Sequence, residues 1–251
     1  MTQPSTNGGT PASSGRTPAQ GNRLDPWYDV YADRAHNLRA SEIRALFSVV
    51  SRPEVVSLAG GMPNLKDLPL DKLAASAEKL IRNHGAQYGS GQGWEVLRER
   101  ITEVMSYDGI VGADPDDVVV TTGSQQALDL VTELFVNPGD VILAEAPSYV
   151  GALGVFRARQ ADVVHVPMDE NGIIPEALVE TIRDVRSSGR TIKFIYIIPN
   201  YHNPGGVTMS AERRPIIAEI CLREHVLIVE DNPYGLLGFH NDPLPAIASY
   251  S

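Results

Sequence analysis

The chain has 251 residues, 43% of them hydrophobic, which is enough for the core of one large domain. Its formal net charge of −10 argues against nucleic acid or an anionic membrane as a partner. Its single cysteine, Cys221, leaves no disulfide framework or metal cluster, and no apolar run approaches a membrane span, so the cytoplasm is the expected location.

A polar segment and a helix are predicted in the N-terminal part of the chain. Residues 1–22 are mostly Thr, Ser, Pro, Gly, Gln and Ala, and we expect a disordered tail. Apolar residues at helical spacing predict a helix over residues 40–50, with Arg44 on its flank. A short strand then runs into a turn at Gly60 and Gly61, which is either an ordinary turn or a close approach of the backbone to a ligand.

Two amphipathic helices are predicted next, over residues 71–84 and 94–105, and the second should bury its apolar stripe. The glycine-rich stretch 87–93 lies between them and contains Tyr88. Its glycine spacing invites a dinucleotide-loop interpretation, but a helix rather than a strand precedes it. We therefore interpret this stretch as a connector.

Short apolar strands alternate with helices along the rest of the chain. Strands are predicted at residues 117–122, 141–144, 163–166, 192–198 and 226–230. Helices are predicted at residues 127–135, 147–158, 175–187 and 210–224. This alternation predicts an α/β fold with a mostly parallel sheet and helices on both faces.

Polar residues follow several of these strands, at the sheet edge where ligands bind in open α/β folds. Gly123, Ser124 and Gln125 join a strand to the start of a helix, where free N–H groups and the helix dipole favour a phosphate. The alternative is that Ser124 merely caps the helix.

The other strand ends carry an aromatic residue, an amide and a carboxylate. Tyr149 could stack on a flat ring or pack under a loop, and Asn203 could be a turn residue. Asp231 follows a very apolar strand, where a carboxylate is costly unless it is paired, for example with a protonated ring nitrogen. Together with Tyr234 as a second hydrogen-bond donor, these are the groups needed to hold pyridoxal phosphate.

Several ordered motifs carry a resemblance to a known family. The chain resembles fold-type I pyridoxal-phosphate enzymes of the class I/II aminotransferases, in the branch of 2-aminoadipate, kynurenine and aromatic or branched-chain aminotransferases. The likeness runs from about residue 39 to the last residue. The motifs are Ser57-Leu58-Ala59-Gly60-Gly61-Met62-Pro63, Gln87-Tyr88-Gly89, Thr122-Gly123-Ser124-Gln125-Gln126, Asn137-Pro138-Gly139-Asp140, Pro147-Ser148-Tyr149, His202-Asn203-Pro204-Gly205-Gly206 and Asp231-Asn232-Pro233-Tyr234.

The resemblance implies a role for each candidate residue in binding pyridoxal phosphate. Residues 123–125 match the phosphate-binding turn, and Tyr149 matches the ring-stacking aromatic residue. Asn203 and Tyr234 match the donors to the ring oxygen, while Asp231 matches the partner of the pyridine nitrogen.

The resemblance also implies partners. Tyr88 matches a tyrosine that reaches the phosphate of a neighbouring subunit, so a homodimer is expected. Gly60 and Gly61 match a loop beside the substrate carboxylate, and Arg44 matches an arginine that reads acidic side chains in some members. The implied substrates are an amino acid and a 2-oxo acid.

The sequence departs from the family at the Schiff-base lysine, which the family carries after the aspartate strand. The lysines here are Lys66, Lys72, Lys79 and Lys193, and all precede Asp231. We therefore expect the N-terminal part of a longer enzyme, without a catalytic lysine of its own. The alternatives are the effector domain of a MocR-like regulator, a catalytically inactive fragment, or another pyridoxal-phosphate reaction.

The expected domain organisation has three parts. Residues 1–22 form the tail, and residues 23–65 form an N-terminal arm and helix near the active site. Residues 66–251 form the large pyridoxal-phosphate-binding domain, incomplete at its C-terminus.

Overall fold

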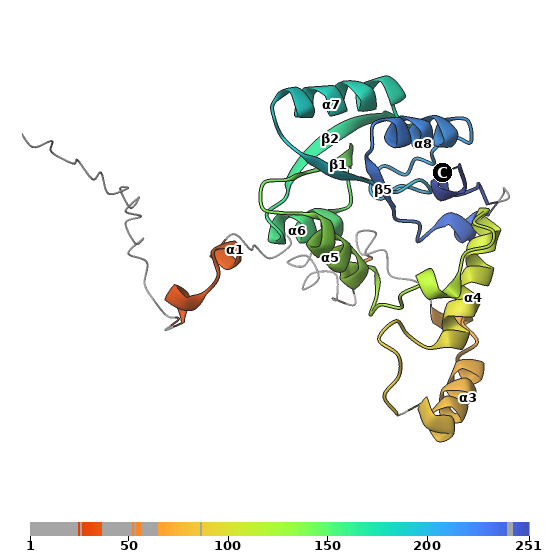
Figure 1. The fold of residues 1–251 in the computed structure, drawn as a ribbon. Coiled ribbons are helices and arrows are strands. Elements are labelled where there is room, and N and C mark those ends of the chain that lie inside the picture. The colour runs from red at the N-terminus through yellow and green to blue at the C-terminus, as the bar shows by residue number, and fades with distance from the viewer. Residues whose placement is uncertain are drawn as a thin grey trace, which may run out of the picture.

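The computed structural model describes residues 25, 27–36, 52, 54–56, 65–85, 87–239 and 243–250 (Figure 1). The predicted tail over residues 1–22 and the predicted helix over residues 40–50 with Arg44 lie outside this described part. Gly60 and Gly61 also lie outside it, so these predictions stay untested.

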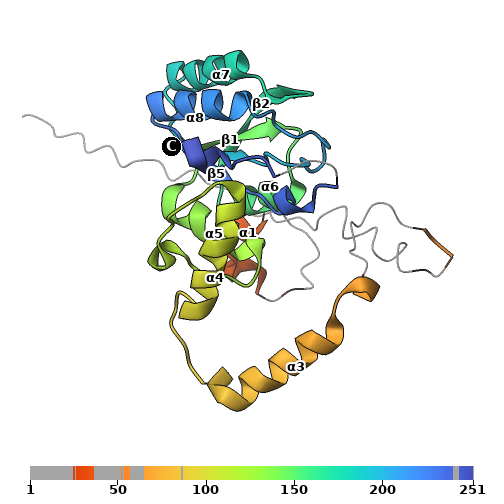
Figure 2. The same cartoon turned by 90° about the vertical axis from the view of Figure 1, so that its right-hand side faces the viewer.

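Short helical elements make up the described N-terminal part, and α3 extends away from the rest of the molecule (Figures 1 and 2). The elements are η1 (Tyr28–Val30), α1 (Asp33–His36), η2 (Leu65–Asp67), α3 (Leu70–Leu80), the π-helical turn η3 (Ile81–Gly85), α4 (Glu95–Met105), η4 (Ser106–Asp108) and η5 (Pro115–Asp117). The predicted buried stripe of α4 is wrong for this chain. Trp94, at the N-cap of α4, and Leu97 are 58% and 42% exposed, because only η4 and η5 contact the helix extensively among the described elements.

The predicted strand over residues 117–122 is also wrong. Asp114 caps η5 by accepting a hydrogen bond from the Asp116 amide, so the chain turns through residues 115–117 instead of extending. The following residues pair with no described strand. The Val118 amide donates to the Pro115 carbonyl within the turn, and the Val120 amide donates to the Gln92 carbonyl. A β-branched run without a partner does not form a sheet strand.

Among the described residues, five strands form one sheet in the order β3-β2-β1-β4-β5. They are β1 (Val141–Ala146), β2 (Asp162–Asp169), β3 (Gly172–Ile173), β4 (Ile192–Ile197) and β5 (Leu227–Glu230). All neighbours pair in parallel except β3, which is antiparallel to β2. The carboxyl ends of β1, β4 and β5 therefore meet at one edge.

Helices cover both faces of the sheet, as the sequence predicts (Figures 1 and 2). Helices α7 (Pro175–Ser187) and α8 (Arg213–Arg223) pack on the face that carries Val141 and Leu143. Helices α5 (Ser124–Phe135) and α6 (Val150–Ala158) pack on the opposite face, with Ile142, Phe194 and Tyr196. Alternate residues of each central strand thus point to different helical layers. The short elements η6 (Gly235–Leu237) and η7 (Ile247–Tyr250) follow β5.

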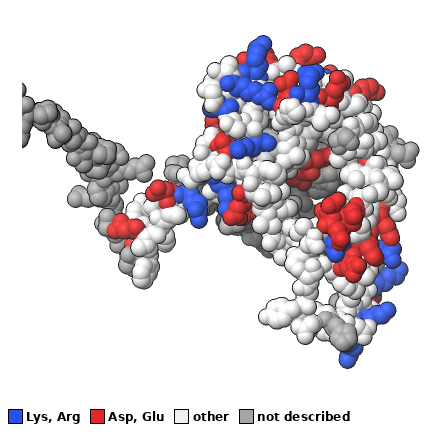
Figure 3. Space-filling model, viewed as in Figure 1, with Lys and Arg blue, Asp and Glu red and all other residues white. Residues whose placement is uncertain are grey.

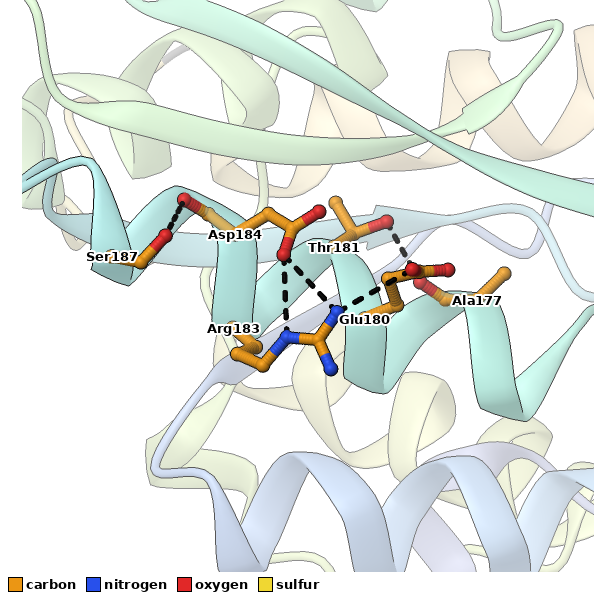
Figure 4. A network of polar contacts seen from close by, with 6 residues as sticks. All are labelled: Ala177, Glu180, Thr181, Arg183, Asp184 and Ser187. Atoms are coloured by element: carbon orange, nitrogen blue, oxygen red, sulfur yellow. Dashed lines mark hydrogen bonds and ion pairs between the residues drawn. The ribbon is translucent and has the colours of Figure 1, made fainter.

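The outer face of α7 carries a polar network that faces solvent (Figure 4). Arg183 lies 3.4 Å from Glu180 and 3.3 Å from Asp184, and these three side chains are each 65–68% exposed. Exposed pairs of this kind contribute only about 0–1 kcal/mol each. The apolar residues on the inner face, including Leu178 and Ile182, are what hold α7 to the sheet.

Acidic side chains gather over α4, whose sequence carries Glu95, Glu99 and Glu103 (Figure 3). Within the described ranges, no group of three or more His, Cys, Asp or Glu residues could hold a metal ion. No helix there is long and apolar enough to cross a membrane.

Cys221 provides a test of the core, since burial raises the pKa of its thiol to about 12. We expect no alkylation by iodoacetamide at pH 8 until the chain unfolds. Because the folded pKa exceeds the ordinary value of 9.0, the neutral thiol contributes stability below pH 9 that is lost as the pH rises towards 12. Rapid labelling of the folded chain, followed by mass spectrometry, would contradict this burial.

Candidate functional site

The first turn of α5 offers unpaired amide groups beside the sheet. Gly123 has φ of +90°, a conformation that glycine adopts without strain, and it is the N-cap of α5. The side chain of Gln126 folds back, so that its Oε1 accepts hydrogen bonds from the Thr122 amide and hydroxyl at 2.6 and 2.8 Å.

These contacts fix the conformation of the turn and leave two backbone amides without an acceptor. The amides of Ser124 and Gln125 find no acceptor among the described residues, and the Ser124 side chain makes no capping bond. The capping alternative for Ser124 is therefore wrong in this structure. Two free N–H groups at a helix N-terminus form a ready binding place for an anion.

Gln125 and Tyr149 lie side by side over Gly151, in the first turn of α6. A Cβ atom added to Gly151 would lie 2.5 Å from Gln125 Nε2 and 2.5 Å from the nearest atoms of the Tyr149 ring. Tyr149 is half-buried, immediately before α6. The structure thus brings the Tyr149 ring close to the first turn of α5, and Gly151, which sequence reasoning did not single out, leaves room for this contact.

Replacing Gly151 by alanine should therefore disturb ligand binding. The added methyl group would displace the Tyr149 ring and the Gln125 amide, and aromatic stacking on a flat ring is worth about 1–3 kcal/mol. We expect the affinity for pyridoxamine phosphate to fall roughly tenfold or more, as measured by calorimetry.

Gly154 in the same helix is the matched control, since a Cβ there meets no atom within 4 Å. Gly154→Ala should leave affinity unchanged and raise helix stability by about 0.5–1 kcal/mol. Equal affinities of the two variants would contradict the placement of Tyr149.

Asp231 follows β5 and is held by its neighbours on β4. Its amide donates to the Ile197 carbonyl at 2.8 Å, and its Oδ2 accepts a 2.6 Å hydrogen bond from the Tyr196 hydroxyl. Asp231 is half-buried, and its Oδ1 accepts no hydrogen bond from any described residue. One carboxylate oxygen is thus fixed while the other is available.

Tyr196, in β4, lies close to both Asp231 and Tyr149. It is fully buried, and this burial, with its hydrogen bond to Asp231 and the charge there, raises the pKa of its hydroxyl far above the ordinary value, so the hydroxyl stays a donor. Glu145 and Tyr149 are close enough to add to that rise. The sequence could have indicated a role for Tyr196 in one way. A tyrosine within an aliphatic strand is expected to be buried, and its buried hydroxyl then needs a hydrogen-bond partner.

Asn203 lies in the loop between β4 and α8, half-buried, and its side-chain amide meets no partner in the described part of the chain. The loop closes through hydrogen bonds from the His202 amide to Val207 O at 2.7 Å and from the Gly205 amide to His202 Nδ1 at 3.0 Å. Because Nδ1 accepts, the ring proton sits on Nε2.

Glu145 ties this loop to β1, which sequence reasoning did not predict. Its Oε2 accepts a 2.8 Å hydrogen bond from the Ile198 amide and lies 3.1 Å from His202 Nε2. His202 Nε2 has no hydrogen-bond partner among the described residues, so its approach to Glu145 is a polar contact rather than a hydrogen bond. Both side chains are about 1% exposed, which fixes the base of the Asn203 loop.

The two remaining candidate tyrosines differ in their placement. Tyr234 lies three residues after Asp231, half-buried before η6, and its hydroxyl meets no partner among the described residues. Tyr88 is 100% exposed, and this chain alone does not bring it to the other candidate residues.

The described lysines lie away from this sheet edge. Lys193 sits at the start of β4, at the opposite edge, with its Nζ 3.2 Å from Asp140 Oδ2. Lys66 lies in η2, and Lys72 and Lys79 lie in α3.

The comparisons with known proteins identify the family of the chain. The family model described as "Aminotransferase class I and II" matches residues 53–249, and the chain belongs to this family, whose members depend on pyridoxal phosphate. It is 36% identical over 223 residues to aromatic-amino-acid aminotransferase 1 of Thermococcus litoralis, covering 88% of this chain and 54% of the relative. It is 34% identical over 225 residues to 2-aminoadipate transaminase of Thermus thermophilus, with the same coverage of 88% and 54%.

Solved structures show the same fold. Kynurenine aminotransferase from Pyrococcus horikoshii, in complex with PMP, superposes with a TM-score of 0.80 at 35% identity, covering 90% of this chain and 56% of that one. Alpha-aminoadipate aminotransferase from Thermus thermophilus, complexed with N-(5'-phosphopyridoxyl)-L-leucine, gives 0.77 at 32% identity, covering 89% and 54%. The chain thus spans about half the length of the relatives that it matches.

Proposed function

We propose that the chain carries the cofactor-binding part of an aminotransferase that moves an amino group between an amino acid and a 2-oxo acid. The observation that carries this proposal is the carboxylate of Asp231, fixed through Oδ2 and open at Oδ1, at the sheet edge that also receives Tyr149. Bound pyridoxal phosphate supplies an electron sink for reactions at the amino acid Cα.

The residues present fit this cofactor. The free amides of Ser124 and Gln125 would bind the phosphate, and the Tyr149 ring would cover one face of the pyridine. Asp231 would hold the proton on the ring nitrogen through a charge-assisted hydrogen bond. Asn203 and Tyr234 would donate to the ring oxygen.

The substrates and partners are part of the same proposal. Gly60 and Gly61 would lie beside the substrate carboxylate, and Arg44 would contact an acidic substrate side chain, in keeping with the family pattern. The fully exposed ring of Tyr88 supports a homodimer in which it reaches a neighbouring subunit. Cys221 is the single cysteine of the chain and is buried, which supports a cytoplasmic location.

Binding of pyridoxamine phosphate tests the proposal without any reaction. We expect the chain to bind it at least tenfold more tightly than pyridoxamine in calorimetry, since the amides of α5 recognise the phosphate. Inorganic phosphate should compete with it. Equal binding of the two compounds, or no binding of either, would contradict the proposed site.

A further inference from the structure

The hydrogen bond between Tyr196 and Asp231 joins two neighbouring strands at the centre of the candidate site. Tyr196 pairs with Val229 in the parallel register of β4 and β5, and its hydroxyl donates to Asp231 Oδ2 at 2.6 Å. The phenol ring is completely buried and packs edge-on against Phe156, with 5.5 Å between the ring centroids. The donor is therefore held in place by the core.

We propose that Tyr196 is a positioning residue that turns the Asp231 carboxylate so that Oδ1 presents its lone pairs to the ring nitrogen of a phosphorylated pyridine. This inference rests on the proposed function and adds to it a residue that lies inside the sheet rather than at its edge.

The geometry supports a positioning role in two ways. The terminal torsion of an aspartate is broad, so a free carboxylate samples many orientations. A single strong donor at Oδ2, together with the backbone bond from the Asp231 amide to Ile197 O, removes this freedom. No described residue competes for Oδ1, which leaves that oxygen for the ligand.

A purely structural role is the alternative, in which Asp231 only satisfies the buried hydroxyl of Tyr196. The two roles differ in what the ligand senses. A positioning role depends on the ring nitrogen, whereas a structural role affects every ligand of the same shape equally.

The test compares pyridoxamine phosphate with its deaza analogue, in which a C–H group replaces the ring nitrogen. Tyr196→Phe removes one oxygen and keeps the ring that packs on Phe156. We expect the variant to bind pyridoxamine phosphate roughly three- to tenfold more weakly and the analogue within about twofold of the wild-type chain. Tyr107→Phe removes an exposed hydroxyl in η4 and should change neither affinity.

A double-mutant cycle with Asp231→Ala covers the case in which Tyr196→Phe folds poorly. Asp231→Ala leaves the buried Tyr196 hydroxyl without an acceptor, and the double variant removes that hydroxyl as well. The two variants can therefore be compared directly. When Asp231→Ala is already present, adding Tyr196→Phe should leave the affinity for pyridoxamine phosphate unchanged.

Three results would overturn the inference. These are equal losses for both ligands in Tyr196→Phe, no loss for pyridoxamine phosphate, or a further loss of affinity when Tyr196→Phe is added to Asp231→Ala. If the wild-type chain binds neither ligand, the proposed function fails and this inference falls with it.

Discussion

Asp231→Ala is expected to weaken binding of pyridoxamine phosphate about 10- to 150-fold, because a hydrogen bond to a charged group contributes about 1.5–3 kcal/mol. The same change removes the acceptor of the buried Tyr196 hydroxyl. An unsatisfied buried donor costs about 1–3 kcal/mol, so the free energy of unfolding should fall as well. Calorimetry and urea unfolding measure the two effects separately.

Comparing Asp231→Asn with Asp231→Ala separates the effect on ligand affinity from the effect on stability. The asparagine side-chain oxygen can still accept from Tyr196, so stability should stay close to that of the wild-type chain. Its amide carries no charge, so the affinity for the protonated pyridine should still fall. Wild-type affinity in both variants would exclude Asp231 as the partner of the ring nitrogen.

Arg214→Met is expected to lower the free energy of unfolding by about 3–5 kcal/mol, the range for breaking a buried charged network. Arg214 is completely buried in α8. Its guanidinium donates to Asn200 Oδ1 at 2.6 Å, to Pro245 O at 2.8 Å and to Met209 O at 3.2 Å. Burial lowers the pKa of Arg214, and the charge of Glu230 opposes that shift.

Methionine fills a similar volume but leaves these acceptors unpaired and Glu230 without its cation. Arg223→Met, at the end of the same helix, is the control, because the Arg223 side chain is 54% exposed and pairs only at the surface. That control should change stability by no more than about 0.5 kcal/mol in urea unfolding. If Arg214→Met lowered the free energy of unfolding no more than Arg223→Met does, the buried network would contribute little to stability.

The layered fold was predictable because its signals are local. The aliphatic runs that form β1 and β4 and the periodic pattern over residues 175–187 predict their elements directly, and α7 spans that same range. The pattern does not say what will cover an apolar surface. Residues 117–122 have strand composition without a partner, and Trp94, Leu97 and Val104 of the α4 stripe are apolar but exposed among the described residues.

The site was predictable only in part, for a similar reason. Ser124, Tyr149 and Asp231 stand at element ends, where chain order shows them. Tyr196 and Gly151 lie inside elements, and their roles depend on strand register and on side-chain directions across helices. The pairing of Glu145 with the Asn203 loop depends on how β1 and β4 lie together in the sheet, which no local pattern encodes.

An NMR titration of backbone amides with pyridoxamine phosphate tests the central claim most directly. We predict that the largest shifts occur at Ser124 and Gln125, with further shifts at Tyr149 and Asp231, while inorganic phosphate moves only the first pair. Shifts confined to other parts of the chain, or no shifts at saturating ligand, would contradict a phosphopyridine site at the carboxyl edge of β1, β4 and β5.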